Sequence, residues 1–320
     1  MADSIKPTPG AQRLDAWLVR RGLADSRRQA RDLIAAGHVR VNGRRWRKGR
    51  SVGFDDVVEL DPPSAAPALT PDSHLPLDVL YHDEEILVVN KPALLPCHPL
   101  HLEDRPTLMN LVAAHFPQAA HAGNKPLEGG LVHRLDNGTS GAIMVALSEA
   151  GFVRLRAALK SGQIERSYVA LIAGALEHPL ELDTPIAHHP RNRRKMTVVH
   201  DPRAAAKLKA RPAMTAVTPI RKVNGFTLVE VIPRTGSRHQ IRVHLADAGW
   251  PIAGDDLYGG PAMAALAPGR FFLHLAELRI PPAGKRNSVQ ISSVDDGQET
   301  LIVVAPLPDD LQACVEDPRP

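Results

Sequence analysis

The chain has 320 residues, of which 43% are hydrophobic and 23% are charged, a balance typical of a folded globular protein. No apolar run is long enough to span a membrane, and the polar segment Met1 to Gly10 lacks the features of a secretory signal, so we expect a cytoplasmic protein. The two cysteines, Cys97 and Cys314, and the 15 histidines show no metal-binding spacing, which argues against a disulfide framework and predicts no metal.

The formal net charge is only +4, but the basic residues are concentrated near the N-terminus. Residues 11–60 hold 12 Lys and Arg against 6 Asp and Glu, a local charge of +6, so the remaining residues sum to −2. A charge run is usually a solvated face. This asymmetry instead favours a nucleic-acid partner for the N-terminal segment.

The segment 12–60 is predicted to form two helices and a small sheet. Apolar residues recur at helical spacing over 14–18, and Ser26 opens a capping box for a second helix. An Asn-Gly turn predicts a hairpin over 39–46, and a further strand is expected over 56–60. The segment is therefore predicted to be a compact α/β module.

Arginines gather on the second helix and the hairpin of this module, which is the electrostatic pattern expected for contacts with phosphates. The motifs RLD at 13–15 and HVRVNG at 38–43 resemble the S-four-type RNA-binding domain. The resemblance implies an RNA partner. The predicted RNA-binding residues are Arg27, Arg28, Arg31, Arg40, Arg44 and Arg45.

A linker, a larger domain and a tail are predicted to follow. Residues 61–75 hold four prolines among Ala and Ser, which is typical of a semi-stiff linker, so the larger domain is expected over 76–306 and the tail over 307–320. Short turns join most successive strands there, which favours a mixed, mainly antiparallel sheet and an α+β class. The expected strands are 86–89, 168–172, 197–199, 214–220 and 227–232, and the expected helices are 107–115, 149–159 and 238–248.

Asp136 lies in a glycine-punctuated bend, HRLDNGTSG at 133–141, between the apolar runs 131–132 and 142–147. Such a bend can place a carboxylate at a cleft where strands end. An Asp before Asn-Gly is also typical of a structural turn, and these residues alone favour that interpretation. His133, at the start of the bend, is expected to be a structural histidine.

Two further motifs follow in order, ERSYVALIAG at 165–174 and RTGSRHQIRVHL at 234–245. Together with VVNKP at 88–92 and GDDLYG at 254–259, they closely resemble the RluA-type RNA pseudouridine synthases over residues 77–305. The resemblance implies a central mixed sheet and the isomerisation of uridine in RNA to pseudouridine. That reaction needs a nucleophile but no redox step, so no cofactor is expected.

The resemblance also implies roles for individual residues. Asp136 would be the nucleophile, Arg242 its paired cation, and Tyr168 the ring that stacks on the uracil and a candidate base for the carbon-5 proton. Arg134 would fill the gap left by a flipped uridine, and Leu245 would line the base pocket. From the residues alone, Arg134 could instead be a salt-bridged strand residue, and Arg242 a surface helix residue.

We therefore expect a monomeric enzyme that modifies structured RNA, with large-subunit ribosomal RNA as the first substrate and transfer RNA as the second. The alternative is a non-catalytic RNA-binding factor for ribosome assembly. Glycoside hydrolysis usually needs two carboxylates, and the bend offers only Asp136, although Asp255 or Asp256 could lie nearby. The basic stretch 191–211, with eight Lys and Arg, fits a second RNA contact and an exposed insertion equally well.

Overall fold

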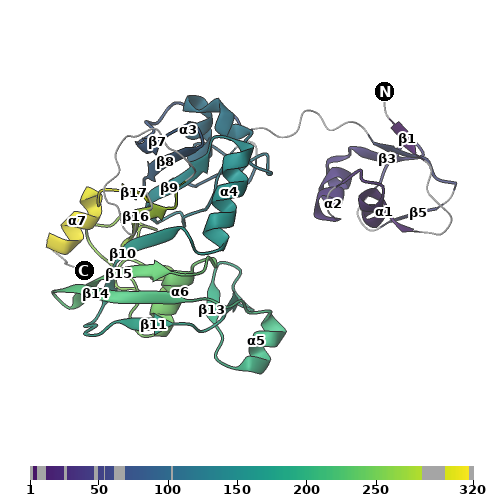
Figure 1. Cartoon of the computed structure of the whole chain (residues 1–320). Helices are drawn as coiled ribbons and strands as arrows, with labels where there is room; N and C mark the ends of the chain where they lie inside the picture. Colours follow the sequence, from purple (N-terminus) through teal and green to yellow (C-terminus); the bar gives the residue numbers. More distant parts are fainter. Residues whose placement is uncertain are drawn as a thin grey trace. The chain divides into compact units, whose positions relative to one another are not determined.

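The computed structural model describes residues 3–5, 12–24, 27–46, 50–53, 55–60, 69–101, 104–282 and 300–316. The chain divides into two compact units, residues 1–67 and 68–320 (Figure 1). Each unit has a hydrophobic core of its own. Among the described residues, no helix is both long enough and apolar enough to cross a membrane.

The smaller unit contains two helices and short strands, as the sequence predicts. Four strands form a sheet in the order β1-β6-β3-β4, and β2 pairs with β5. Trp17 and Leu18 of the first helix are buried together with Ala30 and Ile34 of the second. The elements are β1 (Asp3–Ile5), β2 (Gln12–Arg13), α1 (Leu14–Arg20), α2 (Arg27–Ala36), β3 (Val39–Val41), β4 (Arg44–Arg45), β5 (Ser51–Val52) and β6 (Val58–Leu60).

The hairpin between β3 and β4 turns at Asn42 and Gly43, both with positive φ, as a tight Asn-Gly turn requires. The strand expected from residue 56 begins at Val58, because the Asp56 side chain forms hydrogen bonds with the hairpin turn and with Gly53. It accepts hydrogen bonds from the Asn42 amide and from the backbone N–H of Gly53, each 2.7 Å long. The predicted cap Ser26 lies outside the described residues.

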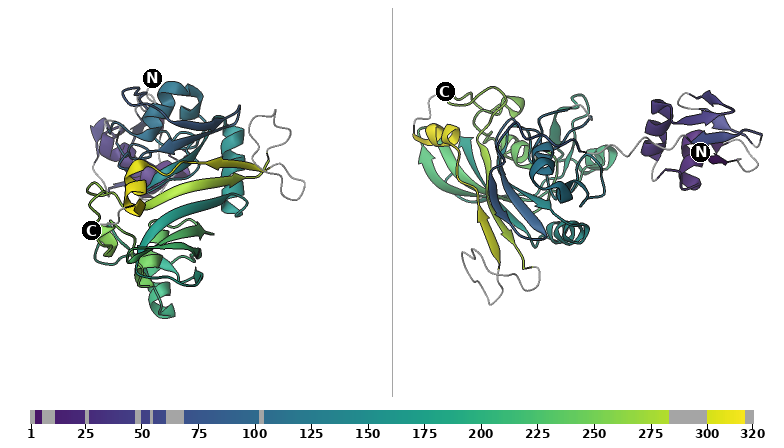
Figure 2. Two further views of the ribbon diagram at one scale, coloured as in Figure 1. Left: turned by 90° about the vertical axis from the view of Figure 1, so that its left-hand side faces the viewer. Right: turned by 90° about the horizontal axis from the view of Figure 1, so that it is seen from above.

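The larger unit is built on a nine-stranded sheet, which Figure 2 shows from two sides. Its order is β11-β14-β15-β10-β16-β9-β8-β7, with β17 also paired to β16. Among the strand pairings described for this sheet, only that of β16 with β9 is parallel, so the predicted mixed, mainly antiparallel sheet is confirmed. The strands are β7 (Val79–His82), β8 (Ile86–Lys91), β9 (Ser140–Ala146), β10 (Glu165–Ala173), β11 (Leu180–Leu182), β14 (Thr215–Val223), β15 (Phe226–Pro233), β16 (Leu273–Ile280) and β17 (Leu301–Val304).

Helices and a separate hairpin surround this sheet. Helix α4 packs on β9, and α6 packs on β13, β14 and β15. Thr107 and Ser148 cap α3 and α4 by accepting a backbone N–H, which explains where these helices begin. The remaining elements are α3 (Leu108–His115), the short helix η1 (Pro117–Ala120), α4 (Glu149–Lys160), β12 (Ile186–His188), β13 (Met196–Val198), α5 (Pro202–Leu208), α6 (Gln240–Asp247), η2 (Asp256–Tyr258) and α7 (Asp309–Glu316).

Strand burial follows the sequence pattern. All seven residues of β9 are buried, which explains its nearly continuous apolar run. In β15, buried residues alternate with partly exposed ones, the pattern of a strand with one face on the core. Strand β9 is therefore a central strand, and the bend that contains Asp136 leads directly into it.

The predicted linker is too long at its C-terminal end. Leu69 is 5% exposed and belongs to the core of the larger unit. The Asn110 amide donates to the Thr70 carbonyl (2.7 Å), and the Asp72 N–H donates to the Asn110 carbonyl (3.0 Å). Residues 69–72 therefore belong to the larger unit, while 61–68 lie outside the described residues.

The predicted tail is also corrected by the structure. Helix α7 forms within it, and its residues Leu311 and Cys314 are fully buried in the core of the larger unit. The apolar positions 311 and 314 are three apart, the spacing of one helix face. The C-terminal segment up to Glu316 is therefore an integral part of the domain.

Candidate active site

Asp136 lies in a turn just before β9. Its carbonyl accepts the backbone N–H of Thr139 (3.0 Å), and its side chain is 25% exposed. Gly138 is required by close packing, because a Cβ there would collide with the Gly269 carbonyl and lie 2.6 Å from the Phe271 ring. The turn is thus pressed against residues 269–271, with the Asp136 carboxylate still accessible to a substrate.

Arg242 of α6 is the direct partner of Asp136. Its Nη1 donates to Asp136 Oδ2 at 2.9 Å, and its side chain is 7% exposed. The predicted pairing of these two residues is therefore present in the structure. A largely buried arginine that reaches a partly exposed carboxylate is not a surface helix residue.

Helix α6 starts at Gln240, two residues later than the helix expected over 238–248. Its N-cap is His239, which has φ +52° and makes no capping hydrogen bond. Instead, Gln240 Oε1 accepts from the Thr235 hydroxyl (2.8 Å) and from the Ser237 N–H (3.0 Å). The loop before α6 is therefore held by a side chain within the helix.

Asp255 lies behind Arg242 and holds it in place. Arg242 Nε donates to Asp255 Oδ2 (2.7 Å) and Nη2 to Asp255 Oδ1 (2.8 Å), a two-pronged contact with a carboxylate that is 0% exposed. Arg242 therefore binds two carboxylates at once. The GDDLYG motif pointed to this segment, but nothing in the sequence showed that Asp255 contacts Arg242.

Two aromatic rings flank the Arg242 guanidinium, with centroids 4.1 Å away for Phe271 and 5.1 Å for Tyr258. Burial works against the charge, but the hydrogen bonds and charge of Asp255, followed by those of Asp136, outweigh it and raise the pKa of Arg242. The guanidinium is thus permanently charged and fixed in orientation.

Tyr168 of β10 lies on the core side of this site and is 6% exposed. The register against β16 shifts between Ser167 and Tyr168, a strand irregularity of the kind that re-aims a side chain. Burial raises the pKa of Tyr168, Arg166 opposes the shift, and the charge of Asp136 adds to it. Tyr168 is therefore a neutral ring near pH 7, close enough to feel the charge of Asp136.

His239 is a neighbour that the sequence analysis did not assign to the site. Its Nε2 lies 3.9 Å from Asp136 Oδ2, and its Nδ1 lies 2.9 Å from the Tyr258 hydroxyl. Burial lowers the pKa of His239 to about 4, and the charge of Asp136 only partly offsets this. His239 is consequently neutral near pH 7 and forms no ion pair with Asp136.

The structure places the other predicted residues of the larger unit as follows. Arg134 is exposed, with Nη1 3.3 Å from His98 Nε2, and it forms no ion pair with a described acidic residue. Leu245 is 0% exposed and belongs to the core of the larger unit. His133 accepts the Met144 N–H (3.1 Å), and burial lowers its pKa to about 3, as expected for a structural histidine.

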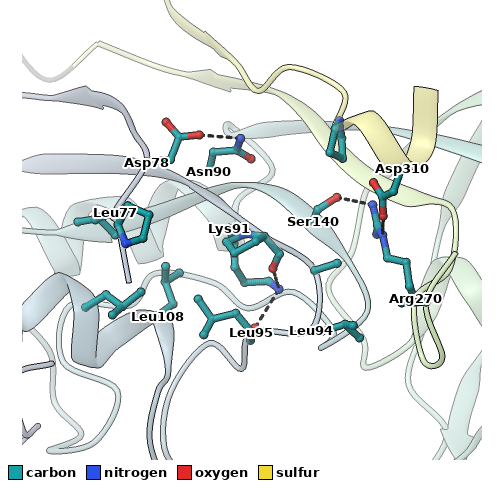
Figure 3. A pocket seen from close by; sticks show the side chains of 16 residues that line it. Leu77, Asp78, Asn90, Lys91, Leu94, Leu95, Leu108, Ser140, Arg270 and Asp310 are labelled. Carbon is teal, nitrogen blue, oxygen red and sulfur yellow. Dashed lines mark hydrogen bonds and ion pairs between the residues drawn. The ribbon is translucent and has the colours of Figure 1, made fainter. Parts of the chain in front are cut away.

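A buried arginine supports the Asp136 turn from behind. Arg270, 2% exposed, donates from Nη1 to the Gly138 carbonyl (2.7 Å) and from Nη2 to the Ser140 hydroxyl (2.9 Å). Its Nε donates to Asp310 Oδ2 of helix α7 (2.8 Å), as Figure 3 shows. The C-terminal helix is thereby connected to the Asp136 turn through one side chain.

Lys91 supports the same turn and is fully buried. Its Nζ donates to the Leu95 carbonyl (3.0 Å) and makes a longer contact with the Asn137 carbonyl (3.4 Å). Burial lowers the pKa of Lys91 to about 8. Lys91 and Arg270 line a cavity of about 450 Å³ (Figure 3), and Asp136 is not part of its wall.

Replacing Asp310 by Asn is expected to slow turnover about tenfold, because Arg270 then loses its only carboxylate partner among the described residues and the Asp136 turn loosens. The affinity for RNA should stay within about twofold of wild type, since Arg270 is buried and cannot contact RNA itself. The control is Asp309→Asn, which removes an exposed charge from the same helix turn. Equal kcat values for the two variants would contradict a link between α7 and the turn.

The predicted RNA-binding residues of the smaller unit differ in their surroundings. Arg31, Arg44 and Arg45 are exposed, and Arg40 of β3 is half-buried. Arg27 is exposed, but it forms an ion pair with the buried Asp15 (3.1 Å). Part of its charge is therefore neutralised within the smaller unit. The side chain of Arg28 lies outside the described residues.

Comparisons with known proteins find relatives of both units of the chain. The family model described as RNA pseudouridylate synthase matches residues 85–247, and the S4 domain model matches residues 12–58. A protein of Chloroflexus aurantiacus named "Uncharacterized RNA pseudouridine synthase" is 35% identical over 310 residues, covering 96% of this chain and 90% of its own. The "Ribosomal large subunit pseudouridine synthase D" of Xanthomonas campestris is 31% identical over 312 residues, covering 96% and 89%.

The solved structure of human RNA Pseudouridylate Synthase Domain Containing 1 is similar as well. It is 25% identical to this chain with a TM-score of 0.54, and the match covers 77% of this chain and 97% of the human one.

Proposed function

The chain belongs to the RNA pseudouridylate synthase family, and from that premise we propose that it isomerises specific uridines of large-subunit ribosomal RNA, with Asp136 as the nucleophile. The observation that carries the proposal is the fixed pair of Asp136 and Arg242, 2.9 Å apart, with Arg242 anchored by Asp255. Several relatives named ribosomal large subunit pseudouridine synthase D support the choice of RNA.

The chemistry is an internal rearrangement. The bond between uracil N1 and ribose C1′ breaks, a bond between uracil C5 and C1′ forms, the C5 proton leaves, and N1 gains a proton. No atom is lost from the RNA overall, so the protein supplies a nucleophile, a proton acceptor and a fixed geometry. Asp136 is the only described carboxylate of the site with accessible surface, because Asp255 is fully buried.

Arg242 orients the nucleophile. Its permanent positive charge lies within hydrogen-bond distance of the Asp136 carboxylate and holds that group in one position. Because Asp255 occupies Nε and Nη2 of Arg242, Nη1 is left to direct the Asp136 carboxylate. An attack by Asp136 on the ribose and an attack on the uracil ring both depend on this arrangement.

The target uridine has to leave its base stack to reach Asp136. Arg134 is exposed two residues before Asp136, where it can enter the gap left by the flipped base. Tyr168 would stack on the uracil and is a candidate acceptor for the C5 proton, given its nearly buried ring close to Asp136. Arg31, Arg44 and Arg45 of the smaller unit would bind phosphates.

The test is tritium release from RNA labelled at uracil C5, because the C5 hydrogen is lost only when C5 forms the new bond. We expect release from unmodified large-subunit ribosomal RNA and little from transfer RNA at equal concentrations. Release from transfer RNA alone would show that transfer RNA, and not ribosomal RNA, is the substrate. No release from either RNA, despite tight binding to ribosomal RNA, would instead support a non-catalytic assembly factor.

A further inference from the structure

The hairpin formed by β12 and β13 is attached to the active site by Tyr258. The Met196 N–H donates to the Tyr258 hydroxyl (2.8 Å), and Lys195 Nζ lies 5.8 Å from the centre of the same ring. Tyr258 also flanks Arg242 at 5.1 Å and contacts His239. The hairpin and the catalytic cation therefore share one aromatic neighbour, so the hairpin tip lies at the rim of the site.

Arg238, at the start of the α6 motif, fixes the backbone of this tip. Its Nη1 donates to the Arg193 carbonyl (3.3 Å) and its Nη2 to the Arg194 carbonyl (3.2 Å). These neutral acceptors leave the positive charge of Arg238 without an acidic partner in the described residues. The contacts bring three arginines together at one edge.

Arginines of the tip point into solvent. Arg191, Arg193 and Arg194 are exposed, and their side chains make no hydrogen bond or ion pair within the part of the chain that the structure describes. Like charges held together repel one another, so the cluster lowers the stability of the free protein. A bound polyanion would remove that repulsion. The two hydrogen bonds from Arg238 hold the cluster in a fixed place beside the active site, which is not expected of a charged face that only contacts solvent.

We propose that an arginine edge, made of Arg191, Arg193, Arg194 and Arg238, binds phosphates of the RNA strand next to the flipped uridine. The inference rests on the proposed function, because it takes the ligand to be the RNA whose uridine reaches Asp136. Guanidinium groups suit the task, since each presents a planar set of donors that can bind a phosphate through two hydrogen bonds. The edge would hold the strand in register while Asp136 reacts.

The two basic surfaces of this protein then have different tasks. The arginines of the smaller unit contact RNA on a separately folded module, whereas the arginine edge is fixed to Tyr258 and Arg238 of the catalytic unit. Loss of the edge should therefore weaken the productive placement of the strand. It should leave the Asp136–Arg242 pair unchanged.

The test is the double variant Arg193→Gln/Arg194→Gln, compared with wild type in RNA binding as a function of salt and in tritium release. Affinity falls as salt rises, and each phosphate contact on a single strand adds about 0.7 to the steepness of log affinity against log salt. Loss of two contacts should therefore make the slope shallower by about 1.4. The KM should rise about tenfold or more, with kcat at saturating RNA within about twofold of wild type. The backbone carbonyls that Arg238 binds remain in this variant.

The matched control is Arg221→Gln/Lys222→Gln, which removes two adjacent exposed cations from β14. They lie six or seven residues, about 20 Å, along the strand from Thr215, the end that contacts α6 through Gln240. The control should keep the wild-type slope and KM. A wild-type slope in the Arg193/Arg194 variant, or an equal loss in both variants, would overturn the proposal.

Failure of the proposed function would be visible separately. The salt dependence is a binding measurement and needs no turnover, so it reports on the arginine edge even when the RNA offered is not modified. If the Arg193/Arg194 variant shows a smaller salt dependence but the wild type releases no tritium, the arginine edge still binds RNA. The RNA offered is then not a substrate, and the proposed function is rejected. A fall in kcat with an unchanged KM would reject the edge.

Discussion

The Asp136→Asn protein is expected to release no tritium above background from C5-labelled RNA, a loss of at least about 10⁴-fold in kcat. The neutral amide cannot attack as the carboxylate does. The substitution is nearly the same size and leaves the backbone carbonyl that closes the turn with Thr139. Arg242 keeps its two bonds to the buried Asp255, so its charge does not become isolated.

Binding separates loss of chemistry from loss of fold. The Asp136→Asn protein should bind RNA with a Kd within about threefold of wild type, because the side chain is one small part of a large phosphate-contacting surface. Asn137→Ala is the control for the turn, since the Asn137 side chain is exposed and its carbonyl, which accepts the Leu94 N–H (2.7 Å), is retained. Residual turnover above about 1% in Asp136→Asn would rule out a nucleophilic role.

The family resemblance, and not a local pattern, identified the candidate site. The residues around Asp136 by themselves favoured a structural turn, and those around Arg242 were equally consistent with a surface helix residue. The contact of Asp136 with Arg242 at 2.9 Å joins residues that are 106 positions apart, a separation that short-range periodicity cannot bridge. Only a family resemblance predicted the pairing.

The supporting residues were harder to predict, because their roles depend on distant contacts. Arg270 lies in a loop and is separated from Gly138 by 132 positions, and nothing in its neighbourhood distinguishes it from a surface arginine. The strand β16 was also missed, since His274, Glu277 and Arg279 interrupt its apolar positions. His274 is nevertheless buried, and its Nδ1 lies 2.9 Å from the Ser140 hydroxyl.

The wrong boundary predicted for the linker also results from contacts between distant parts of the sequence. Proline-rich composition predicted a linker to residue 75, yet Leu69 fits the core and Thr70 accepts a hydrogen bond from Asn110, which is 40 positions away. Composition reports local stiffness and polarity. Composition does not show that a leucine packs into the core of another part of the chain, as Leu69 does.

The Asp255→Asn protein is expected to lose about 10²-fold in kcat while binding RNA normally. Asp255 fixes Nε and Nη2 of Arg242, and an Asn in its place offers one oxygen acceptor and turns an amide N–H₂ toward a guanidinium donor. One of these donors is then left buried without a partner, and the guanidinium rotates toward a better arrangement. A misplacement of about 1 Å at Asp136 is sufficient for a loss of this size.

The adjacent Asp256 provides the matched control, because it is exposed and the same substitution there removes an equal charge from the same motif. Asp256→Asn should keep wild-type kcat and Kd. Loss of the buried contact should also lower the free energy of unfolding of the larger unit by about 1–3 kcal/mol, so activity is compared at a temperature where both variants are folded. If folded Asp255→Asn turned over at the wild-type rate, Arg242 would need no anchor. Asp136 alone would then determine the orientation of the guanidinium, and the cluster would reduce to a simple ion pair.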